Sequence, residues 1–389
     1  MESTPLLLYQ MLVEVLGCHQ NWLDLRHLKT LAWMISGLIQ SGKIGLGSWV
    51  VYVHSRAVYA ASTIRRFRRF LDNDRIEVHR LYGPLLGQAL RQWDHKTLYV
   101  ALDTSMLWGT YCIVRLSLIY RGRAIPIVWK VLEHGSCSIA YEDYQALLDQ
   151  AACLLFPLHF QVIFLADRGF ADTALMGHLM RLGWHFRIRI KTSFWVFRPG
   201  QRPRKVNSIR LSVGHPLFWH NVQITQERFG NVHLALGRPV GSRERWVVVS
   251  DQPTSLETFQ EYGLRFDIEE NFLDDKSNGF QLEASLIRSA KALERLCFVL
   301  ATATLYLVSQ GTQVVQEGKR RLVDAHWFRG KSYLKIGWDW VNLALNRGET
   351  LISRLTLSPE PDPEPAMASR KQHQKRIQPR FTFEIPNAA

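Results

Sequence analysis

The feature that most constrains the fold is an ordered series of apolar segments between residues 97 and 193. Three apolar runs at short intervals predict a strand meander, at residues 98–103, 111–120 and 124–132. Helical and strand patterns then alternate, with helices at 140–156 and 172–183 and strands at 161–167 and 184–193. This order predicts an α/β sheet flanked by helices.

Two aspartates end strands of this predicted sheet. Asp103 closes the first apolar run and Asp167 closes the fourth. In open α/β sheets, chemistry sits outside the carboxyl ends of the strands, so parallel neighbouring strands would bring both carboxylates to one shared cation. A single Asp after a strand is also a common turn former, and Asp251 after residues 246–250 fits that alternative.

A charged helix is predicted at residues 254–276. Thr254 and Ser255, with Glu257 three residues after the threonine, form a capping-box pattern that starts a helix. At about 100° per residue, one narrow arc carries a phenol, a guanidinium, a carboxylate and an amine. These side chains belong to Tyr262, Arg265, Glu269 and Lys276, whereas Leu264, Ile268 and Phe272 lie on the opposite, core-facing side. An ordinary charged surface helix is the alternative interpretation.

Three carboxylates without His or Cys neighbours suit a hard cation. Asp103, Asp167 and Glu269 are therefore candidate ligands for Mg²⁺ or Mn²⁺. Two such ions about 4 Å apart activate an attacking hydroxyl and stabilise the leaving oxygen at phosphorus. Tyr262, Arg265 and Lys276 would then contact phosphates, which positions a nucleic acid without reading its sequence.

The charge balance favours a polyanionic partner. The 389 residues include 48 Lys and Arg against 34 Asp and Glu, a net charge of +14, and the pI is near 9.7. Half of this excess falls in residues 194–250, which read as a β-rich insertion that returns to the sheet. Its tryptophans, Trp195, Trp219 and Trp246, could stack an unpaired base or pack a core.

Basic side chains outside the insertion extend the predicted nucleic-acid surface. On the preceding strand, Arg187, Arg189 and Lys191 share one face by alternation. Residues 1–96 read as a helical DNA-binding domain, in which arginines flank a short apolar stripe. These are Arg65, Arg66, Arg68 and Arg69, which could dock on phosphates or form a solvated face.

The remaining segments bound the class of protein. An apolar content of 47% predicts a globular chain of two or three domains. The run Cys297–Val308 is shorter than a bilayer requires and predicts a buried helix, and no secretory signal opens the chain, so a cytoplasmic protein without membrane association is expected. Five scattered cysteines predict reduced thiols and no zinc site. Residues 311–357 read as a helical region, and the Pro-rich residues 358–389 as a disordered tail.

The sequence resembles the DDE transposases of the insertion-sequence-four type. The resemblance rests on ALDTS around Asp103, FLADRGFAD around Asp167, and the signature Y-(2)-R-(3)-E-(6)-K, met by Tyr262, Arg265, Glu269 and Lys276. It covers roughly residues 97–310, including the insertion at 194–250, whereas the helical N-terminal region fits only in general character.

The resemblance implies a ribonuclease-H-like catalytic core and cut-and-paste DNA transposition. Asp103, Asp167 and Glu269 would hold two Mg²⁺ or Mn²⁺ ions, and Tyr262, Arg265 and Lys276 would contact inverted-repeat end DNA. It further implies a hairpin intermediate, joining to target DNA, a synapsed homodimer and a place at the bacterial nucleoid. Two alternatives remain: a ribonuclease-H-like nuclease, and a non-catalytic DNA-binding protein derived from a transposase.

Overall fold

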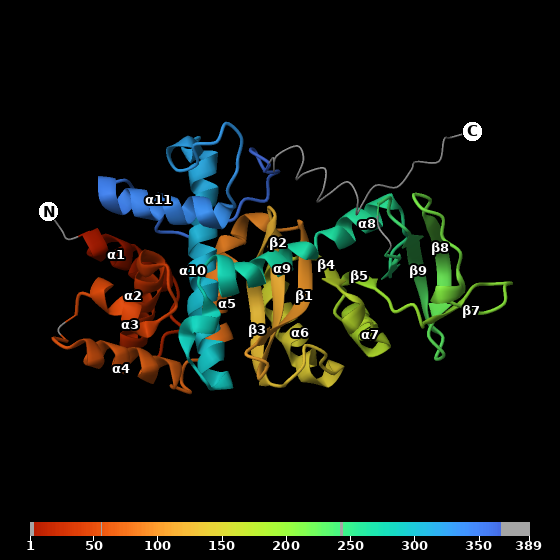
Figure 1. Ribbon diagram of the computed structural model, residues 1–389, viewed down its shortest axis with the longest axis horizontal. Helices are drawn as coiled ribbons and strands as arrows, with labels where there is room; N and C mark the ends of the chain where they lie inside the picture. Colours follow the sequence, from red (N-terminus) through yellow and green to blue (C-terminus); the bar gives the residue numbers. More distant parts are fainter. Residues whose placement is uncertain (1–3, 56, 242–243, 367–389) are drawn as a thin grey trace.

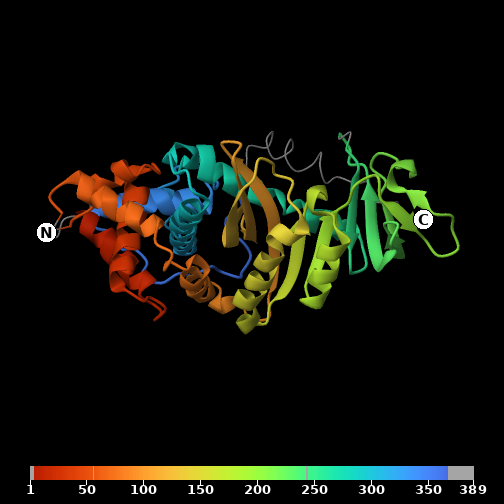
Figure 2. The ribbon, with the colours of Figure 1, turned by 90° about the horizontal axis from the view of Figure 1, so that it is seen from below.

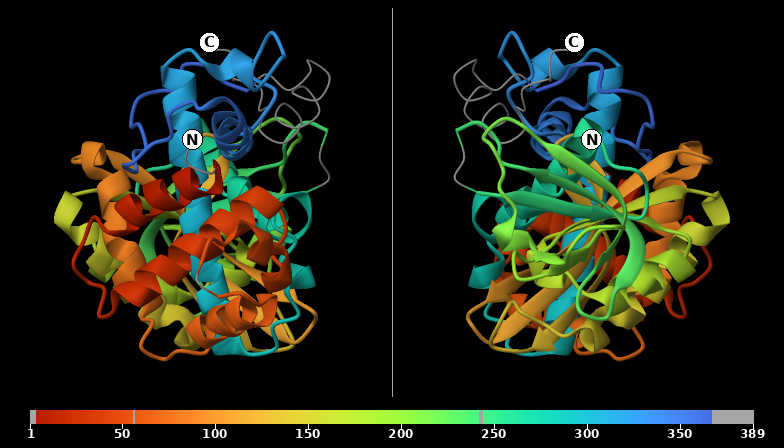
Figure 3. Two further views of the ribbon diagram at one scale, coloured as in Figure 1. Left: turned by 90° about the vertical axis from the view of Figure 1, so that its left-hand side faces the viewer. Right: turned by 90° about the vertical axis from the view of Figure 1, so that its right-hand side faces the viewer.

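The computed structural model describes residues 4–55, 57–241 and 244–366. It is a mixed α/β molecule, elongated, with helices at both chain ends and one ten-stranded sheet. Figure 1 shows the N-terminal helices at one end, the first five strands in the middle and the β-rich insertion at the other end. Figure 3 views the molecule from these two ends.

The N-terminal region is helical, as predicted. Its helices are α1 (Thr4–Leu16), α2 (Leu25–Ser41), α3 (Leu46–Trp49), α4 (Ala60–Leu71) and α5 (Val78–Ala89). Asp24 caps α2 by accepting from the amide of Arg26, and α2 ends at Gly42 with φ of +65°, a left-handed conformation that glycine adopts readily.

The meander and the alternation that follows are confirmed. The elements in chain order are β1 (Thr97–Leu107), β2 (Tyr111–Tyr120), β3 (Arg123–Glu133), α6 (Tyr141–Leu155), β4 (Gln161–Ala166), α7 (Thr173–Arg181) and β5 (His185–Arg189). The strand order is β3-β2-β1-β4-β5, in which β1, β4 and β5 are parallel and β2 is antiparallel to both of its neighbours. Every residue of β2 is buried, which explains why this strand is apolar apart from Arg115 and Ser117.

The insertion is β-rich, as predicted, and it continues the same sheet. Its strands are β6 (Trp195–Phe197), β7 (Arg204–Lys205), β8 (Leu217–Ile224), β9 (Phe229–Gly237) and β10 (Trp246–Ser250). Strand β10 pairs antiparallel with β5, with Val248 opposite Arg189, and the order continues through β9, β8, β6 and β7. The insertion is therefore joined to the central strands by backbone hydrogen bonds.

Two groups of helices cover the sheet. Helices α8 (Leu256–Gly263) and α9 (Phe266–Leu273) cross one face: α8 packs on β5, β9 and β10, and α9 on β1, β2 and β3. Helices α6 and α7 lie against the opposite face (Figure 2). A π-helical turn, Asp274–Asn278, follows α9.

Helix α10 (Ala290–Gln316) is buried between the N-terminal helices and β3, so the prediction of a buried helix at Cys297–Val308 is confirmed. The helix is longer than the apolar run. By length and composition it could cross a membrane, but 94% of its most apolar window is buried inside the protein. It also runs through residue 310, where a domain boundary was expected, and packs on α11 (Tyr333–Arg347).

Helices α10 and α11 cross at glycines. A Cβ atom at Gly337 would overlap the carbonyl oxygen of Leu307, and one at Gly311 would overlap that of Tyr333. We expect Gly337→Ala to lower the free energy of unfolding by about 2–3 kcal/mol, because the helices must separate. Urea denaturation measures this. The control is Gly87→Ala in α5, where a Cβ meets no atom within 4 Å and the better helix former should stabilise slightly. Equal effects would contradict the close crossing.

His79 makes stability depend on pH. Its side chain is buried, its Nε2 accepts a hydrogen bond from the Trp129 amide, and burial lowers the pKa of the imidazole from 6.5 to about 4. Between these values the unfolded chain binds a proton at this site that the folded chain does not, so the contribution of His79 to the free energy of unfolding falls as pH drops from 6.5 to 4. We expect a loss of roughly 3 kcal/mol. Denaturation across this range should show that the wild type loses about this much stability relative to His79→Gln, and that the control, exposed His134→Gln, follows the wild type.

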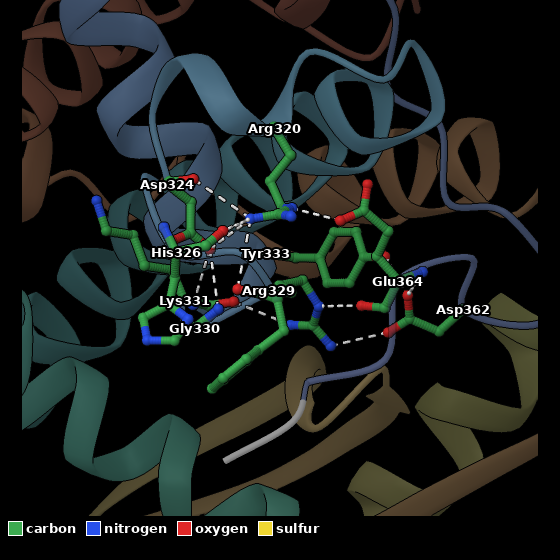
Figure 4. Close-up of polar contacts among 10 residues, drawn as sticks. Arg320, Asp324, His326, Arg329, Gly330, Lys331, Tyr333, Asp362 and Glu364 are labelled. Carbon is green, nitrogen blue, oxygen red and sulfur yellow. Dashed lines mark hydrogen bonds and ion pairs between the residues drawn. The ribbon is translucent and has the colours of Figure 1, made fainter. Parts of the chain in front are cut away.

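The segment after Leu357 does not begin as a disordered tail. Buried arginines bind residues 358–366, and Figure 4 shows these contacts. Arg329 pairs with Asp362 at 2.8 Å, and Arg320 pairs with both Glu364 and Asp324. The prediction of a disordered tail is therefore wrong for residues 358–366. Asp362 and Glu364 pair with buried arginines, and composition alone does not reveal such partners. Its remainder, 367–389, lies outside the described residues.

Candidate active site

Strand pairing brings the two predicted aspartates side by side. The parallel register of β1 and β4 ends with Leu102 opposite Ala166, so Asp103 and Asp167 are the next residues of adjacent strands. Neighbouring strands lie about 4.8 Å apart. Strand β4 ends directly before Asp167, as predicted. Strand β1 continues four residues past Asp103, so Asp103 marks the point where β1 leaves β4 rather than the end of the strand.

Local hydrogen bonds fix both carboxylates. Asp103 Oδ1 accepts from the Thr104 amide at 2.8 Å, and Asp167 Oδ1 accepts from the Gly169 amide at 2.7 Å. Asp167 thereby caps a short 3-10 turn, Arg168–Phe170. An aspartate can form a turn and still take part in chemistry here. In both residues only Oδ1 accepts the local hydrogen bond, so Oδ2 can bind other partners.

Glu269 reaches the same place from α9 through Arg265. One guanidinium nitrogen of Arg265 lies 3.2 Å from Asp103 Oδ2, and the other lies 2.7 Å from Glu269 Oε1. The Arg265 side chain is 7% exposed, whereas that of Glu269 is 51% exposed. The guanidinium therefore bridges the strand carboxylate and the helix carboxylate.

The carboxylates also interact electrostatically. Burial raises the pKa of Asp103 from 3.8 to about 6; Arg265 opposes this shift, and the charges of Asp167 and Glu269 add to it. Mutual repulsion of this kind is relieved by a cation. Within the described residues, the three carboxylates do not form a group whose ligand atoms all lie within 4.8 Å of one another.

The predicted single helix at 254–276 is interrupted. Helix α8 ends at Gly263 and α9 begins at Phe266, and the amides of Leu264 and Arg265 bond three residues back rather than four. The tighter turn shifts the angular positions that a continuous helix would give. Ser255, paired with Thr258, caps α8, so the capping box at Thr254 and Glu257 is wrong. The Thr254 hydroxyl instead donates to the Leu234 carbonyl.

This interruption changes the predicted exposed arc. Tyr262 is fully buried against Trp246, with ring centroids 5.3 Å apart, and Arg265 is buried as well. Lys276 lies in the π-helical turn and donates to the Met106 carbonyl of β1. On the opposite side, Ile268 and Phe272 are buried, as predicted. The four signature residues therefore do not project together: Tyr262 and Arg265 line the cleft, Glu269 is half-exposed, and Lys276 contacts β1.

A cleft of about 350 Å³ opens beside Asp167. Its walls carry three arginines, two acids and three aromatic rings from four separate segments. The lining residues include Asp167, Arg168, Arg189, Trp246, Tyr262 and Arg265. The predicted site residue Arg189 therefore faces this cleft, where it pairs with Glu244 at 3.3 Å. Anions of the size of a phosphate suit such a lining.

The predicted basic face of β5 is only partly open, because Arg189 lines the cleft whereas Arg187 is covered. Arg187 shares a face with Arg189, as alternation requires, but it is buried beneath α8. It pairs there with Glu261 at 2.5 Å and lies 4.0 Å from Asp251. A covering helix that supplies acids cannot be inferred from the strand pattern alone.

Trp195, Trp219 and the arginines of α4 lie outside the carboxylate site, whereas Trp246 of the insertion lines its cleft. Trp195 and Trp219 are half-buried, beneath Lys205 and Arg198 respectively. Helix α4 lies at the far end of the molecule from the insertion (Figure 1). On α4, the apolar stripe faces the core; Arg66 is half-buried, and Arg65, Arg68 and Arg69 are exposed.

Sequence reasoning missed a buried ion pair beneath the site. Arg115 lies opposite Asp103 in the β1–β2 register and contacts Asp275 at 2.6 Å and Asn271 at 2.8 Å. Arg123 similarly contacts Asp274 at 3.0 Å and Glu270 at 3.5 Å. The sequence did contain a signal for this pair: Arg115 is the one charged residue in the apolar run 111–120, and a buried charge requires a partner.

A scan against protein-family models and a search of curated proteins find no match for this chain.

Proposed function

We propose that this chain is a metal-dependent DNA transposase with a ribonuclease-H-like core. The observation that carries the proposal is that Asp103 and Asp167 directly follow the last paired residues of two adjacent parallel strands. Arg265 joins Glu269 to Asp103. The element order β1-β2-β3-α6-β4-α7-β5 and the spacing of the four signature residues support the same class of enzyme.

Asp103, Asp167 and Glu269 would hold two Mg²⁺ or Mn²⁺ ions. All three donors are carboxylates, the ligands that hard divalent cations prefer, and Asp103 bears the repulsion of the other two. When bound, the ions would activate the attacking hydroxyl and stabilise the leaving oxygen at phosphorus. The half-exposed Glu269 side chain can exchange its contact with Arg265 for such an ion.

The protein's own side chains would position the DNA. Arg168, Arg189 and Arg265 line the cleft beside Asp167 and would neutralise a phosphate there. The Tyr262 ring packs behind this wall, and Lys276 holds the continuation of β1 beyond Asp103. We propose that Tyr262, Arg265 and Lys276 contact end DNA in this setting, as the signature implies.

Strand cleavage tests the proposal. The protein is incubated with Mg²⁺ and duplex DNA carrying the inverted repeats that flank its own reading frame. Hairpinned ends and joined products would support cut-and-paste transposition, through a hairpin and a synapsed dimer. Hydrolysis without joining would favour a ribonuclease-H-like nuclease. DNA binding without any cleavage would favour a non-catalytic protein derived from a transposase and would overturn the proposal.

A further inference from the structure

Beyond the carboxylate site, Asp94, His95 and His159 converge on the protein surface. One ligand atom from each residue lies within 4.8 Å of the other two, and all three side chains are exposed. Asp94 and His95 precede β1, and His159 precedes β4. Because Thr97 pairs with Gln161 at the start of these strands, the group lies at the opposite end of β1 and β4 from Asp103 and Asp167.

The distances in this group are too long for hydrogen bonds. Asp94 Oδ1 lies 3.5 Å from His159 Nδ1, and Asp94 Oδ2 lies 3.8 Å from His95 Nε2. Direct His–carboxylate pairs close to less than 3 Å. The same structure shows this elsewhere: the His178–Asp149 and His185–Asp251 pairs are 2.8 and 2.7 Å long.

The observed separations approach those expected around one ion. Two nitrogen or oxygen ligands of a tetrahedral zinc ion, each about 2.0–2.1 Å from it, lie about 3.3–3.4 Å apart. The His95 and His159 rings face each other with centroids 5.5 Å apart and an interplanar angle of 18°. Both imidazoles can therefore turn a nitrogen toward a common point beside the Asp94 carboxylate.

The backbone holds the two histidines in this arrangement. His95 and His159 are both non-glycine residues in the left-handed region, with φ of +57° and +49°. Such a conformation costs free energy that the surrounding structure must offset. The two loops are tied together by a hydrogen bond from the Gln161 amide to the Lys96 carbonyl at 3.1 Å, and Thr97 Oγ1 donates to the Gln161 side chain at 3.1 Å.

We propose that Asp94, His95 and His159 form a binding site for a borderline divalent transition metal such as Zn²⁺, Co²⁺ or Ni²⁺. Two imidazole nitrogens and one carboxylate select these ions over Mg²⁺, which prefers oxygen ligands throughout. The remaining coordination positions face solvent. A bound ion clips together the loops that enter β1 and β4, the two strands that carry Asp103 and Asp167.

Metal binding to the full-length protein tests this site directly. Co²⁺ is titrated in excess Mg²⁺, which would occupy the proposed carboxylate site, and binding is followed by visible absorption and by calorimetry; one equivalent of Co²⁺ is expected to bind. His95→Ala and His159→Ala should each weaken binding by at least about tenfold, because even the loss of an outer-shell partner commonly costs about 10–100-fold. Zn²⁺ should compete for the same equivalent and should raise the midpoint of thermal unfolding more in the wild type than in His95→Ala or His159→Ala, since it binds the folded chain.

Two controls separate this site from others. His134→Ala removes an equally exposed histidine outside the group and should bind Co²⁺ as the wild type does. Glu269→Gln alters the proposed catalytic carboxylates and should also leave this binding unchanged, so the outcome is independent of any DNA chemistry. Absence of a bound equivalent, or equal losses in His134→Ala and His159→Ala, would overturn the proposal.

Discussion

Replacing Glu269 with glutamine is expected to reduce the rate of DNA strand cleavage by at least about a thousandfold, which is a rise of about 4 kcal/mol in the activation barrier. Glutamine keeps the shape of the side chain but lacks the charge that a divalent ion requires. It can still accept a hydrogen bond from Arg265, whose other nitrogen pairs with Asp103 at 3.2 Å. The fold should therefore be retained. Single-turnover cleavage of end DNA measures the rate, and a gel-shift titration measures binding.

The matched control for this change is Glu270→Gln, one residue along the same helix. Glu270 pairs with Arg123 at 3.5 Å, whereas it is Glu269 that pairs with Arg265. We expect Glu270→Gln to cleave within a few-fold of the wild type. If both variants lost activity equally, or if Glu269→Gln cleaved normally, Glu269 would not be the third catalytic carboxylate.

Truncating Asp275 to alanine is expected to lower the free energy of unfolding by about 3–5 kcal/mol, because it leaves a buried guanidinium without its countercharge. The side chains of Arg115 and Asp275 are only 1% and 4% exposed and lie 2.6 Å apart. Arg115 also stacks on the ring of Phe272, with its guanidinium carbon 4.8 Å from the ring centroid. Urea denaturation followed by circular dichroism measures the loss.

A double variant distinguishes an unpaired charge from a simple packing defect. Replacing both partners with apolar residues, as in Arg115→Met with Asp275→Leu, removes the stranded charge and should recover most of the lost stability. A packing defect would instead make the double variant at least as unstable as Asp275→Ala. A loss below about 1 kcal/mol in Asp275→Ala would show that the pair contributes little, as exposed pairs do.

The sheet could be predicted because its signals are local. Apolar runs bounded by turns gave strands and helices in the right order between residues 97 and 193, and both aspartates follow the last paired residues of β1 and β4. The parallel pairing of those strands was a condition in the prediction, and the structure meets it. The β-rich character of residues 194–250 likewise follows from composition and alternation.

The contacts around Arg265 could not be predicted, because they depend on residues far apart in the sequence. A continuous helix of 100° per residue placed Tyr262 and Arg265 in solvent, but the bonds of Leu264 and Arg265 tighten the turn and bury both side chains. The covering of Arg187 by Glu261 and the binding of Glu364 by Arg320 are of the same kind. Each of these contacts joins a buried arginine to an acidic residue from a distant segment of the chain.

The continuous ten-stranded sheet has a consequence for protein engineering. Strand β10 occupies the outer side of β5, so the insertion covers what would otherwise be an open row of backbone amides and carbonyls. A shortened chain that replaced residues 194–250 with a loop would expose this row, and unprotected strand edges recruit other chains. The insertion thus prevents β5 from pairing with a strand of another chain. A variant without the insertion is expected to self-associate through this edge.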